Sequence, residues 1–228
     1  MAIRFRPMPG LTVAALICLP ILIGLGVWQY QRWQWKTDVL AEIDAAVTAP
    51  PLQGLQALID ADGPLDFRRI QFDGTETGET FLFYSPEGNI AWMPFRVVEA
   101  AGETALVGFP TIADGLKETA SAPTMAGPRA GYVRRVRPPG FLSRIIGTPD
   151  NPTDNRWFSI NPDGVWLDGA DLYIDVSQGR RDASQLPVQR PDIPNNHVSY
   201  MLTWWSFAII LLVIYAILHI RAGRLSRD

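Results

Sequence analysis

Residues 194–205 have the sequence PNNHVSYMLTWW, and an apolar run without Asp, Glu, Lys or Arg follows from Met201 to Ile220. A helix of about 20 apolar residues crosses the roughly 30 Å hydrocarbon layer of a bilayer. The run therefore predicts a transmembrane helix over residues 200–220, which begins close to His197, one of two histidines in the chain. An imidazole at that boundary can ligate a metal, while the neighbouring tryptophans can anchor in the headgroup layer or pack on a flat ligand.

A second apolar run lies near the N-terminus, where residues 11–28 carry no charge and follow Arg4 and Arg6. A signal peptide also begins with basic residues, but this run is long, and residues 28–33 (WQYQRW) offer no small-residue cleavage site. We therefore predict an uncleaved transmembrane helix over residues 11–29.

The charges that flank the two runs predict the topology. Arginines precede the first run and follow the second, so residues 1–10 and 221–228 are expected to face the cytoplasm or an equivalent compartment. Arg32 and Lys36, on the far side of the first helix, weaken this bias locally. Residues 30–199 then form a domain on the outer side of the membrane.

Composition limits the remaining possibilities. The chain has 228 residues, enough for one globular domain plus membrane anchors. Its net charge of −3 argues against a nucleic-acid partner. The single cysteine, Cys18, lies inside the first apolar run and cannot form an intramolecular disulfide.

The outer domain has a β-rich pattern. Helix is expected to continue through Val39, Ile43 and Val47 to Pro50-Pro51, and a short helix is expected over residues 52–62. Short β-like runs between turn residues then predict strands over residues 67–72, 80–84, 90–98, 104–109, 131–136 and 172–176. Pro94 suggests an edge position or a bulge, and residues 111–130, 138–155 and 177–196 look irregular. The predicted fold class is thus a membrane α+β protein, in which two transmembrane helices flank an extracytoplasmic antiparallel sheet or small barrel with short helices.

Two clusters of side chains are candidates for a site. At about 100° per residue, the second helix places His197, Tyr200, Met201 and Trp204 on one face, with Trp205 beside them. The first helix places Trp28, Arg32 and Trp35 on one face, flanked by Gln29 and Lys36. Both clusters are expected at the outer boundary of the membrane.

These are the groups that a haem site uses: an imidazole for the iron, indoles for the macrocycle and an arginine for a propionate. Composition favours a simpler interpretation, in which the tryptophans are interfacial anchors, the arginine reaches the headgroups and His197 caps its helix. His219 is about 33 Å further along the helix, so the two histidines cannot ligate one iron, and His219 is expected to be an interfacial residue on the inner side. An iron held by His197 would take its second axial ligand from elsewhere, bind a water there, or leave that position open.

Catalytic motifs are missing from the outer domain. It contains no cysteine and no histidine before His197, which excludes Cys–His and Ser–His arrangements within it. No Walker or dinucleotide-binding glycine motif is present. The sequence therefore predicts a protein that is not an enzyme.

Two motifs resemble one known family. Residues 26–36 (GVWQYQRWQWK) are similar to the first-helix signature G-x-W-Q-x-x-R-x-x-W-K of the Surfeit locus protein 1 family, and residues 194–205 to its second signature, N-N-H-x-x-Y-x-x-T-W. Between them, Arg68-Arg69 with Gly74, and residues 155–157 (NRW), resemble shorter family segments. The chain departs from the family at residues 107–110 (VGFP), where members usually carry N-R-G-W-x-P.

The resemblance implies a bacterial inner-membrane protein with a periplasmic domain, which acts as an assembly factor for haem-copper cytochrome c oxidase. It implies transient binding of haem a, with His197 as the metal ligand and help with insertion into the catalytic subunit. The remaining expected haem contacts are Trp28, Gln29, Arg32, Trp35, Tyr200, Trp204 and Trp205. The catalytic subunit and membrane lipid are the expected partners, and haem a synthase stays open as another. A cofactor-free scaffold for nascent oxidase subunits is the main alternative; a membrane enzyme acting on haem or quinone and a double-pass sensor are weaker ones.

Overall fold

The computed structural model describes residues 3–85, 91–116, 127–136, 141–160, 164, 165, 167 and 171–227. The chain divides into two compact units. One contains Met1–Ala41 with Asp192–Asp228, and the other contains Glu42–Pro191. The first unit is helical and the second is built mainly from β-strands.

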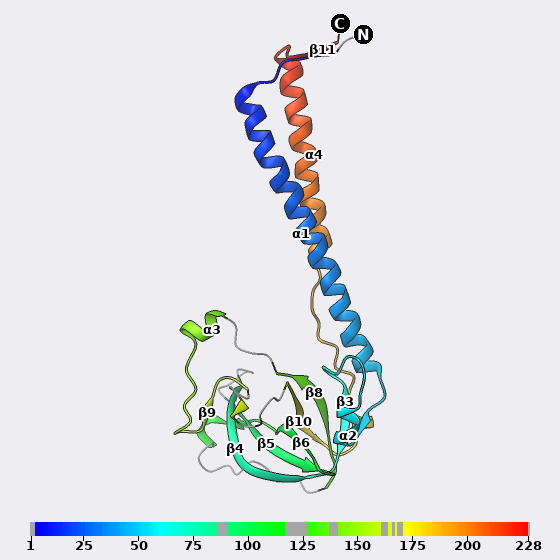
Figure 1. The fold of residues 1–228 in the computed structure, drawn as a ribbon, viewed down its shortest axis with the longest axis vertical. Helices are drawn as coiled ribbons and strands as arrows, with labels where there is room; N and C mark the ends of the chain where they lie inside the picture. The colour runs from blue at the N-terminus through cyan, green and yellow to red at the C-terminus, as the bar shows by residue number, and fades with distance from the viewer. Residues whose placement is uncertain are drawn as a thin grey trace. The chain divides into compact units, whose positions relative to one another are not determined.

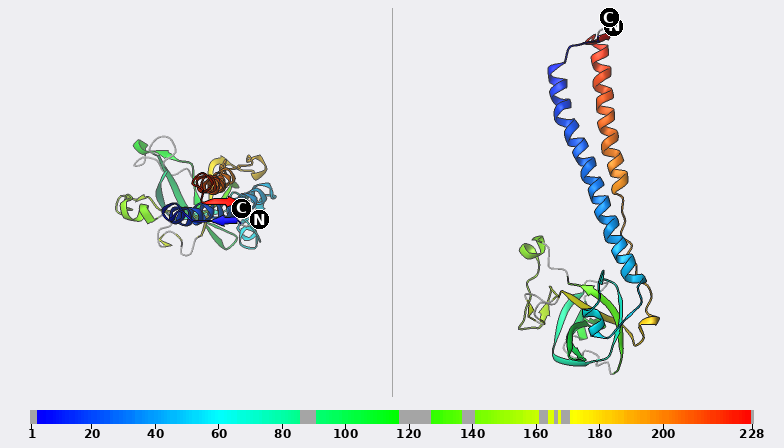
Figure 2. Two further views of the ribbon diagram at one scale, coloured as in Figure 1. Left: turned by 90° about the horizontal axis from the view of Figure 1, so that it is seen from above. Right: turned by 45° about the vertical axis from the view of Figure 1, so that its right-hand side comes forward.

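Two long helices form the first unit. Helix α1 spans Pro9–Thr48, although its last turns belong to the second unit, and helix α4 spans His197–Arg221. Figures 1 and 2 show them side by side and running in opposite directions. Both are long and apolar enough to cross a membrane, and only 6% of the most apolar stretch of each is buried in the protein. Such exposure is typical of helices that face lipid rather than of core helices in a soluble protein, so the prediction of two apolar helices flanking a β-rich domain is confirmed.

Helix α1 is longer than a membrane span requires. The predicted span over residues 11–29 and the predicted helix through Val47 are one continuous element, and Pro20 does not interrupt it. A proline inside a helix removes one backbone hydrogen bond, which apolar spans tolerate when their neighbours compensate. The membrane boundaries at residues 29 and 200 remain predictions.

Along residues 15–36 of α1 and residues 201–219 of α4, less exposed residues recur at steps of three or four. On α1 they are Ala15, Leu19, Leu22, Gly26, Gln29, Trp33 and Lys36, and on α4 they are Met201, Trp205, Ala208, Leu211, Tyr215 and His219. A repeat of about 3.5 residues is typical of paired helices that keep one seam in contact along their length. We call these two rows the helix seam.

The chain termini are joined at one end of the helix pair. Strand β1 (Ile3–Phe5) pairs in antiparallel fashion with β11 (Leu225–Arg227), which was not predicted because each strand has only three residues. His219 is fully buried, accepts a hydrogen bond at Nε2 from the Met8 backbone N–H (3.1 Å) and donates one from Nδ1 to the Tyr215 carbonyl (2.9 Å). The interfacial position of His219 on the inner side stays a prediction; within the protein, this side chain ties the N-terminal segment to α4.

The second unit contains a mixed sheet with the strand order β2-β3-β8-β10-β6-β5-β4-β9, and β7 pairs with β5. Figure 1 shows this sheet curling around its core. The strands are β2 (Leu52–Gln53), β3 (Arg69–Phe72), β4 (Thr75–Ser85), β5 (Ala91–Ala100), β6 (Glu103–Gly108), β7 (Ile112–Ala113), β8 (Arg129–Arg135), β9 (Arg156–Trp157) and β10 (Leu172–Arg180). All six predicted strands are present within a few residues; Ile90, the expected start of the third, lies outside the described residues.

Several shorter elements differ from the predictions. The helix expected over residues 52–62 is strand β2 followed by α2 (Leu55–Ile59). The stretches expected to be irregular contain β7, η1 (Asp114–Leu116), α3 (Phe141–Ile146), η3 (Ala183–Gln185) and the ends of β8 and β10. Residues 117–126 and 138–140 of those stretches lie outside the described residues.

Pro94 does not lie at an edge, because β5 is an interior strand between β4 and β6. Its carbonyl accepts a hydrogen bond from the Phe109 N–H (2.8 Å), so the imide nitrogen faces the same side of the strand. On that side of β5, the residues that pair with β6 end at Phe95, and the residues that pair with β7 end at Trp92. Pro94, which has no N–H to donate, therefore lies between the part of β5 that pairs with β6 and the part that pairs with β7.

Two hydrophobic clusters use the alternation of side chains along these strands. Val107 of β6 and Ile174 of β10 belong to a fully buried cluster that α2 covers through Leu55. Their neighbours Leu106 and Tyr173 belong to a second cluster around Phe95 and Trp157. Because successive residues of a strand point to opposite faces, the same two strands support both clusters.

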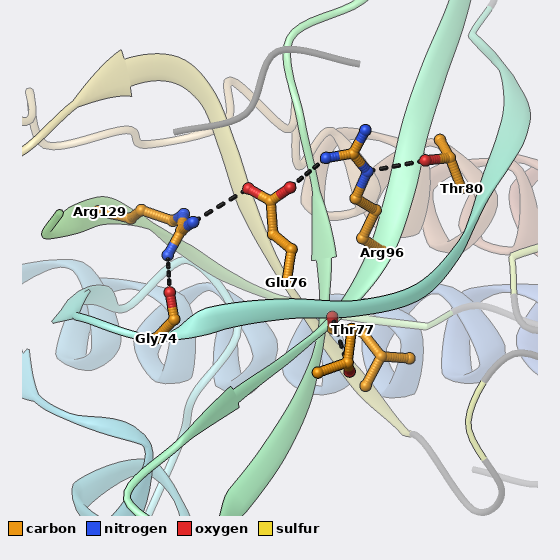
Figure 3. A network of polar contacts seen from close by, with 7 residues as sticks. Gly74, Glu76, Thr77, Thr80, Arg96 and Arg129 are labelled. Carbon is orange, nitrogen blue, oxygen red and sulfur yellow. Dashed lines mark hydrogen bonds and ion pairs between the residues drawn. The ribbon is translucent and has the colours of Figure 1, made fainter. Parts of the chain in front are cut away.

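A network of charges fixes the start of β4 (Figure 3). The Glu76 carboxylate lies between two guanidinium groups, accepting from Arg96 on one oxygen and from Arg129 Nη2 (3.0 Å) on the other. Arg129 also donates to the Gly74 carbonyl (2.6 Å), and Arg96 Nε to Thr80 Oγ1 (2.7 Å). The side chains of all three charged residues are at most 14% exposed, so Glu76 links β4 to β5 and β8 in a largely dry environment.

We predict that Glu76→Gln lowers the free energy of unfolding of the β-rich unit by about 3 kcal/mol, because two largely buried guanidiniums lose their shared carboxylate. Thermal unfolding followed by near-ultraviolet circular dichroism of the full chain in detergent measures the change. Glu79→Gln is the matched control, since Glu79 lies in the same strand but is exposed. Equal melting temperatures for both variants would show that the network contributes nothing.

Candidate functional site

The two sequence motifs meet through a hydrogen bond between helices. His197 Nδ1 lies 2.7 Å from Gln29 Oε1. Gln29 is buried in the helix seam at 9% exposure, and His197 is half-buried as the first residue of α4. Since an amide oxygen only accepts hydrogen bonds, Nδ1 carries a proton, and in the neutral imidazole Nε2 then keeps its lone pair. His197 therefore contacts the other helix, and Asn196, not His197, occupies the N-cap position.

The two helices approach each other closely at Gly26, which lies one helical turn before Gln29 in α1. The Trp205 indole lies against Gly26, and a Cβ at that position would overlap its Nε1, Cδ1 and Cε2 atoms. Only glycine leaves room for the ring, and small residues at apolar helix interfaces serve this purpose. Trp205 thus packs on α1 one helical turn away from Gln29.

On the other side of Gln29, α1 holds the segment that leads into α4. Lys36 Nζ donates to the Pro194 carbonyl, and Asn195 Nδ2 donates to Thr37 Oγ1 (3.4 Å). The Ser199 hydroxyl donates to the Asn196 carbonyl (2.7 Å), which shapes the first turn of α4. The position of His197 is therefore set from both sides.

Trp28, Arg32 and Trp35 do not lie opposite His197. Trp28 is 54% exposed and Trp35 is 50% exposed, and the Arg32 guanidinium stacks on the Trp35 ring with Cζ 3.9 Å from its centroid. Their shared face is about 90° around α1 from Gln29, which points into the seam. Gln29, rather than this face, is therefore directed at His197, and the role of Trp28, Arg32 and Trp35 as haem contacts stays a prediction.

The remaining candidates on α4 are arranged differently from one another. Tyr200 is 56% exposed, whereas Trp204 is half-buried and packs edge-on against Phe207 at 6.1 Å between ring centroids. Trp205 is the tryptophan in the seam. Of the predicted residues, the structure therefore brings Gln29 and His197 into contact and places Trp205 against Gly26, one helical turn from Gln29 on α1.

Sequence reasoning missed Gly26 as part of the site. Gly26, Gln29, Trp33 and Lys36 follow one another at steps of three and four. That spacing is the signal that would have identified the inner face of α1. A glycine in a helical pattern is usually interpreted as a weak point of the helix. Its role here becomes visible only with the Trp205 ring, which comes from a distant part of the sequence.

The shorter family-like segments have structural roles in the β-rich unit. Asn155 has a positive φ of 51°, and its side chain accepts from the Leu82 N–H and Trp157 Nε1 and donates to the Thr80 carbonyl. Gly74 leaves room for the Glu99 carbonyl, which would lie 2.6 Å from a Cβ. Both residues hold β4 in place rather than form a site.

A cleft of about 270 Å³ in the β-rich unit is lined by Arg134, Ser159, Tyr173 and neighbouring residues. Arg134 stacks on Phe67 at 3.9 Å, and burial raises the pKa of Tyr173 although Arg134 opposes this effect. Within the described residues, no group of three or more His, Cys, Asp or Glu side chains could hold a metal ion.

The fold and the site define a class of protein in which two apolar helices bracket a β-rich domain and join through a histidine at the end of one helix. The chain belongs to the SURF1 family, whose model matches residues 16–209 and includes both helix motifs.

Individual relatives give the same result. A SURF1-like protein of Rickettsia conorii is 26% identical over 220 residues, which cover 88% of this chain and 88% of the relative. SURF1-like proteins of Rickettsia felis and Monosiga brevicollis are each 25% identical, covering 90% and 93% of this chain and 95% and 89% of their own lengths.

We predict that Gly26→Ala displaces the Trp205 indole, because the new methyl group overlaps the ring. The Trp205 indole ¹H–¹⁵N resonance, assigned through Trp205→Phe in detergent-solubilised protein, should shift or broaden. Gly24→Ala is the matched control, since nothing lies within 4 Å of a Cβ at Gly24. An unchanged Trp205 resonance in Gly26→Ala would contradict the close contact.

Proposed function

We propose that this protein is an assembly factor for haem-copper cytochrome c oxidase that binds haem a transiently at His197 and assists its insertion into the catalytic subunit. Membership of the SURF1 family is consistent with a role in oxidase assembly. The single observation that supports the haem-binding part is the 2.7 Å contact between His197 Nδ1 and Gln29 Oε1, which leaves Nε2 as a basic nitrogen.

The site residues suit such a ligand. Within the described residues, His197 Nε2 makes no hydrogen bond, whereas both nitrogens of His219 are engaged by Met8 and Tyr215. A haem bound here would supply an iron that accepts one imidazole nitrogen. His197 would bind the metal. Trp28, Trp35 and Arg32, whose shared face is turned about 90° around α1 from Gln29, are retained as proposed contacts for the macrocycle and a propionate.

Single ligation by the protein suits a carrier. A second protein ligand would hold the cargo more firmly, and no second histidine is free within the described residues. The remaining axial position would be open to water or to a residue of the receiving subunit. Release to the oxidase then requires the loss of one protein–iron bond.

The proposed location follows from the charges at the ends of the helix pair. Exposed Arg6, Arg221 and Arg224 lie at the end where β1 pairs with β11. With these groups in the cytoplasm, the β-rich unit would lie in the periplasm of a bacterial cell, next to the outer boundary of the inner membrane.

A cofactor-free scaffold for nascent oxidase subunits is the second candidate. The observation that favours it is the exposure of Trp28 and Trp35, which is typical of tryptophans that anchor a helix at the membrane surface. In that case the histidine would serve only to join the two helices, and the protein would recognise its partner through other surfaces.

We predict that the protein purified from cells that synthesise haem a carries a Soret band and extractable haem a, and that His197→Ala loses both. Cells without haem a synthesis should give protein without haem a. Ser206→Ala, an exposed substitution on the same helix, is the control for expression and solubilisation. An unchanged Soret band in His197→Ala would overturn the ligand assignment. If the unmodified protein carries no haem although its cells assemble a normal amount of oxidase, the scaffold is favoured.

A further inference from the structure

We propose that Gln29 is a positioning residue that fixes His197 in the tautomer able to bind iron through Nε2. This inference deepens the proposed function and rests on it for the identity of the metal. The geometry itself is a property of the protein without a ligand.

The hydrogen-bonding capacities of the two side chains determine the tautomer of His197. A neutral imidazole has one N–H and one basic nitrogen, and the partner of one nitrogen decides which is which. Gln29 Oε1 lies 2.7 Å from His197 Nδ1 and can only accept, so the proton must reside on Nδ1. Nε2 is then the basic nitrogen and the possible metal ligand.

The surroundings make Gln29 suitable for this role. It is 9% exposed, so little water competes with His197 for its amide oxygen. It lies one helical turn from Gly26, against which Trp205 packs. On the other side, Lys36 and Thr37 bind the backbone and side chain of the segment before α4. The imidazole is thus oriented before any ligand arrives.

The opposite orientation of the amide would give the opposite chemistry. If the Gln29 NH₂ group faced Nδ1, it would donate to the ring, and Nε2 would carry the proton. That tautomer cannot bind a metal through Nε2. The direction of one amide therefore decides whether Nε2 of His197 can be a ligand, and the tautomer can be measured without haem.

Metal-binding histidines commonly donate their second N–H to an oxygen of the protein, and loss of that partner typically weakens metal binding by about 10–100-fold. A carboxylate in this position would raise the basicity of the ligating nitrogen more than a neutral glutamine oxygen does. We infer that this moderate support suits a ligand that must later be released.

The first experiment uses ¹⁵N-histidine labelling of the full, haem-free chain in detergent, at a pH where the imidazoles are neutral. The chain contains two histidines, and His219 is an internal reference, because it donates from Nδ1 to the Tyr215 carbonyl and accepts at Nε2. The ¹⁵N shifts should report the Nδ1–H tautomer for both residues, with His197 assigned through His197→Ala.

Gln29→Met keeps a similar volume without an amide oxygen and should release His197 to the Nε2–H tautomer or to a mixture, while His219 stays unchanged. Gln29→Glu keeps an acceptor and should retain the Nδ1–H tautomer. The matched control is Gln31→Met, an exposed glutamine of the same helix, which should change neither histidine. An Nε2–H tautomer in the unmodified protein, or an Nδ1–H tautomer that survives Gln29→Met, would overturn the inference.

The second experiment titrates haem a into the same proteins and follows the Soret band. Gln29→Met should bind about 10–100-fold more weakly than the unmodified protein, and Gln31→Met should bind equally well. Unchanged affinity in Gln29→Met would overturn the positioning role even if the tautomer responds. If no variant binds haem but the tautomer is lost in Gln29→Met, the proposed function fails, and Gln29 remains the residue that sets the tautomer of His197.

Discussion

The close approach of the two apolar helices at Gly26 is the contact on which the candidate site depends. Lipid chains are as apolar as the helix side chains, so association in a membrane needs close packing and polar contacts rather than burial of apolar surface. The Trp205 indole occupies the space that a side chain at Gly26 would fill. The Gln29–His197 hydrogen bond then adds a polar contact, for which about 0.6–2 kcal/mol is typical between membrane helices.

The β-rich unit depends on polar contacts between its strands. Its strands are short, and several of their positions are fixed by single polar side chains: Glu76 joins three strands through two arginines, and Asn155 holds β4 next to β9. These residues are structural, although two of the segments involved resemble family motifs. Membership of a motif therefore does not by itself mark a residue of the site, and the chemistry of His197 depends on its own neighbours.

The sequence was sufficient to predict both long helices and six strands, but not how each helix is rotated about its own axis. Uncharged apolar runs predicted both long helices, and turn residues delimited six strands. Helical periodicity also placed Trp28, Arg32 and Trp35 on one face, but it could not show which face α4 would cover. That depends on which side chains allow close approach, and Gly26 contributes by having none. The short strands β1 and β11 and the place of Pro94 likewise depend on partners distant in the sequence.

The central claim is that His197 supplies the protein ligand of a bound haem a, and the most direct measurement is hyperfine spectroscopy of the ferric complex. With ¹⁵N-histidine in an otherwise ¹⁴N protein, electron–nuclear double resonance detects any imidazole nitrogen bound to the iron. The account predicts coupling to one histidine nitrogen, which disappears in His197→Ala. Absence of ¹⁵N coupling in the haem-loaded protein, or the same coupling in His197→Ala, would contradict it.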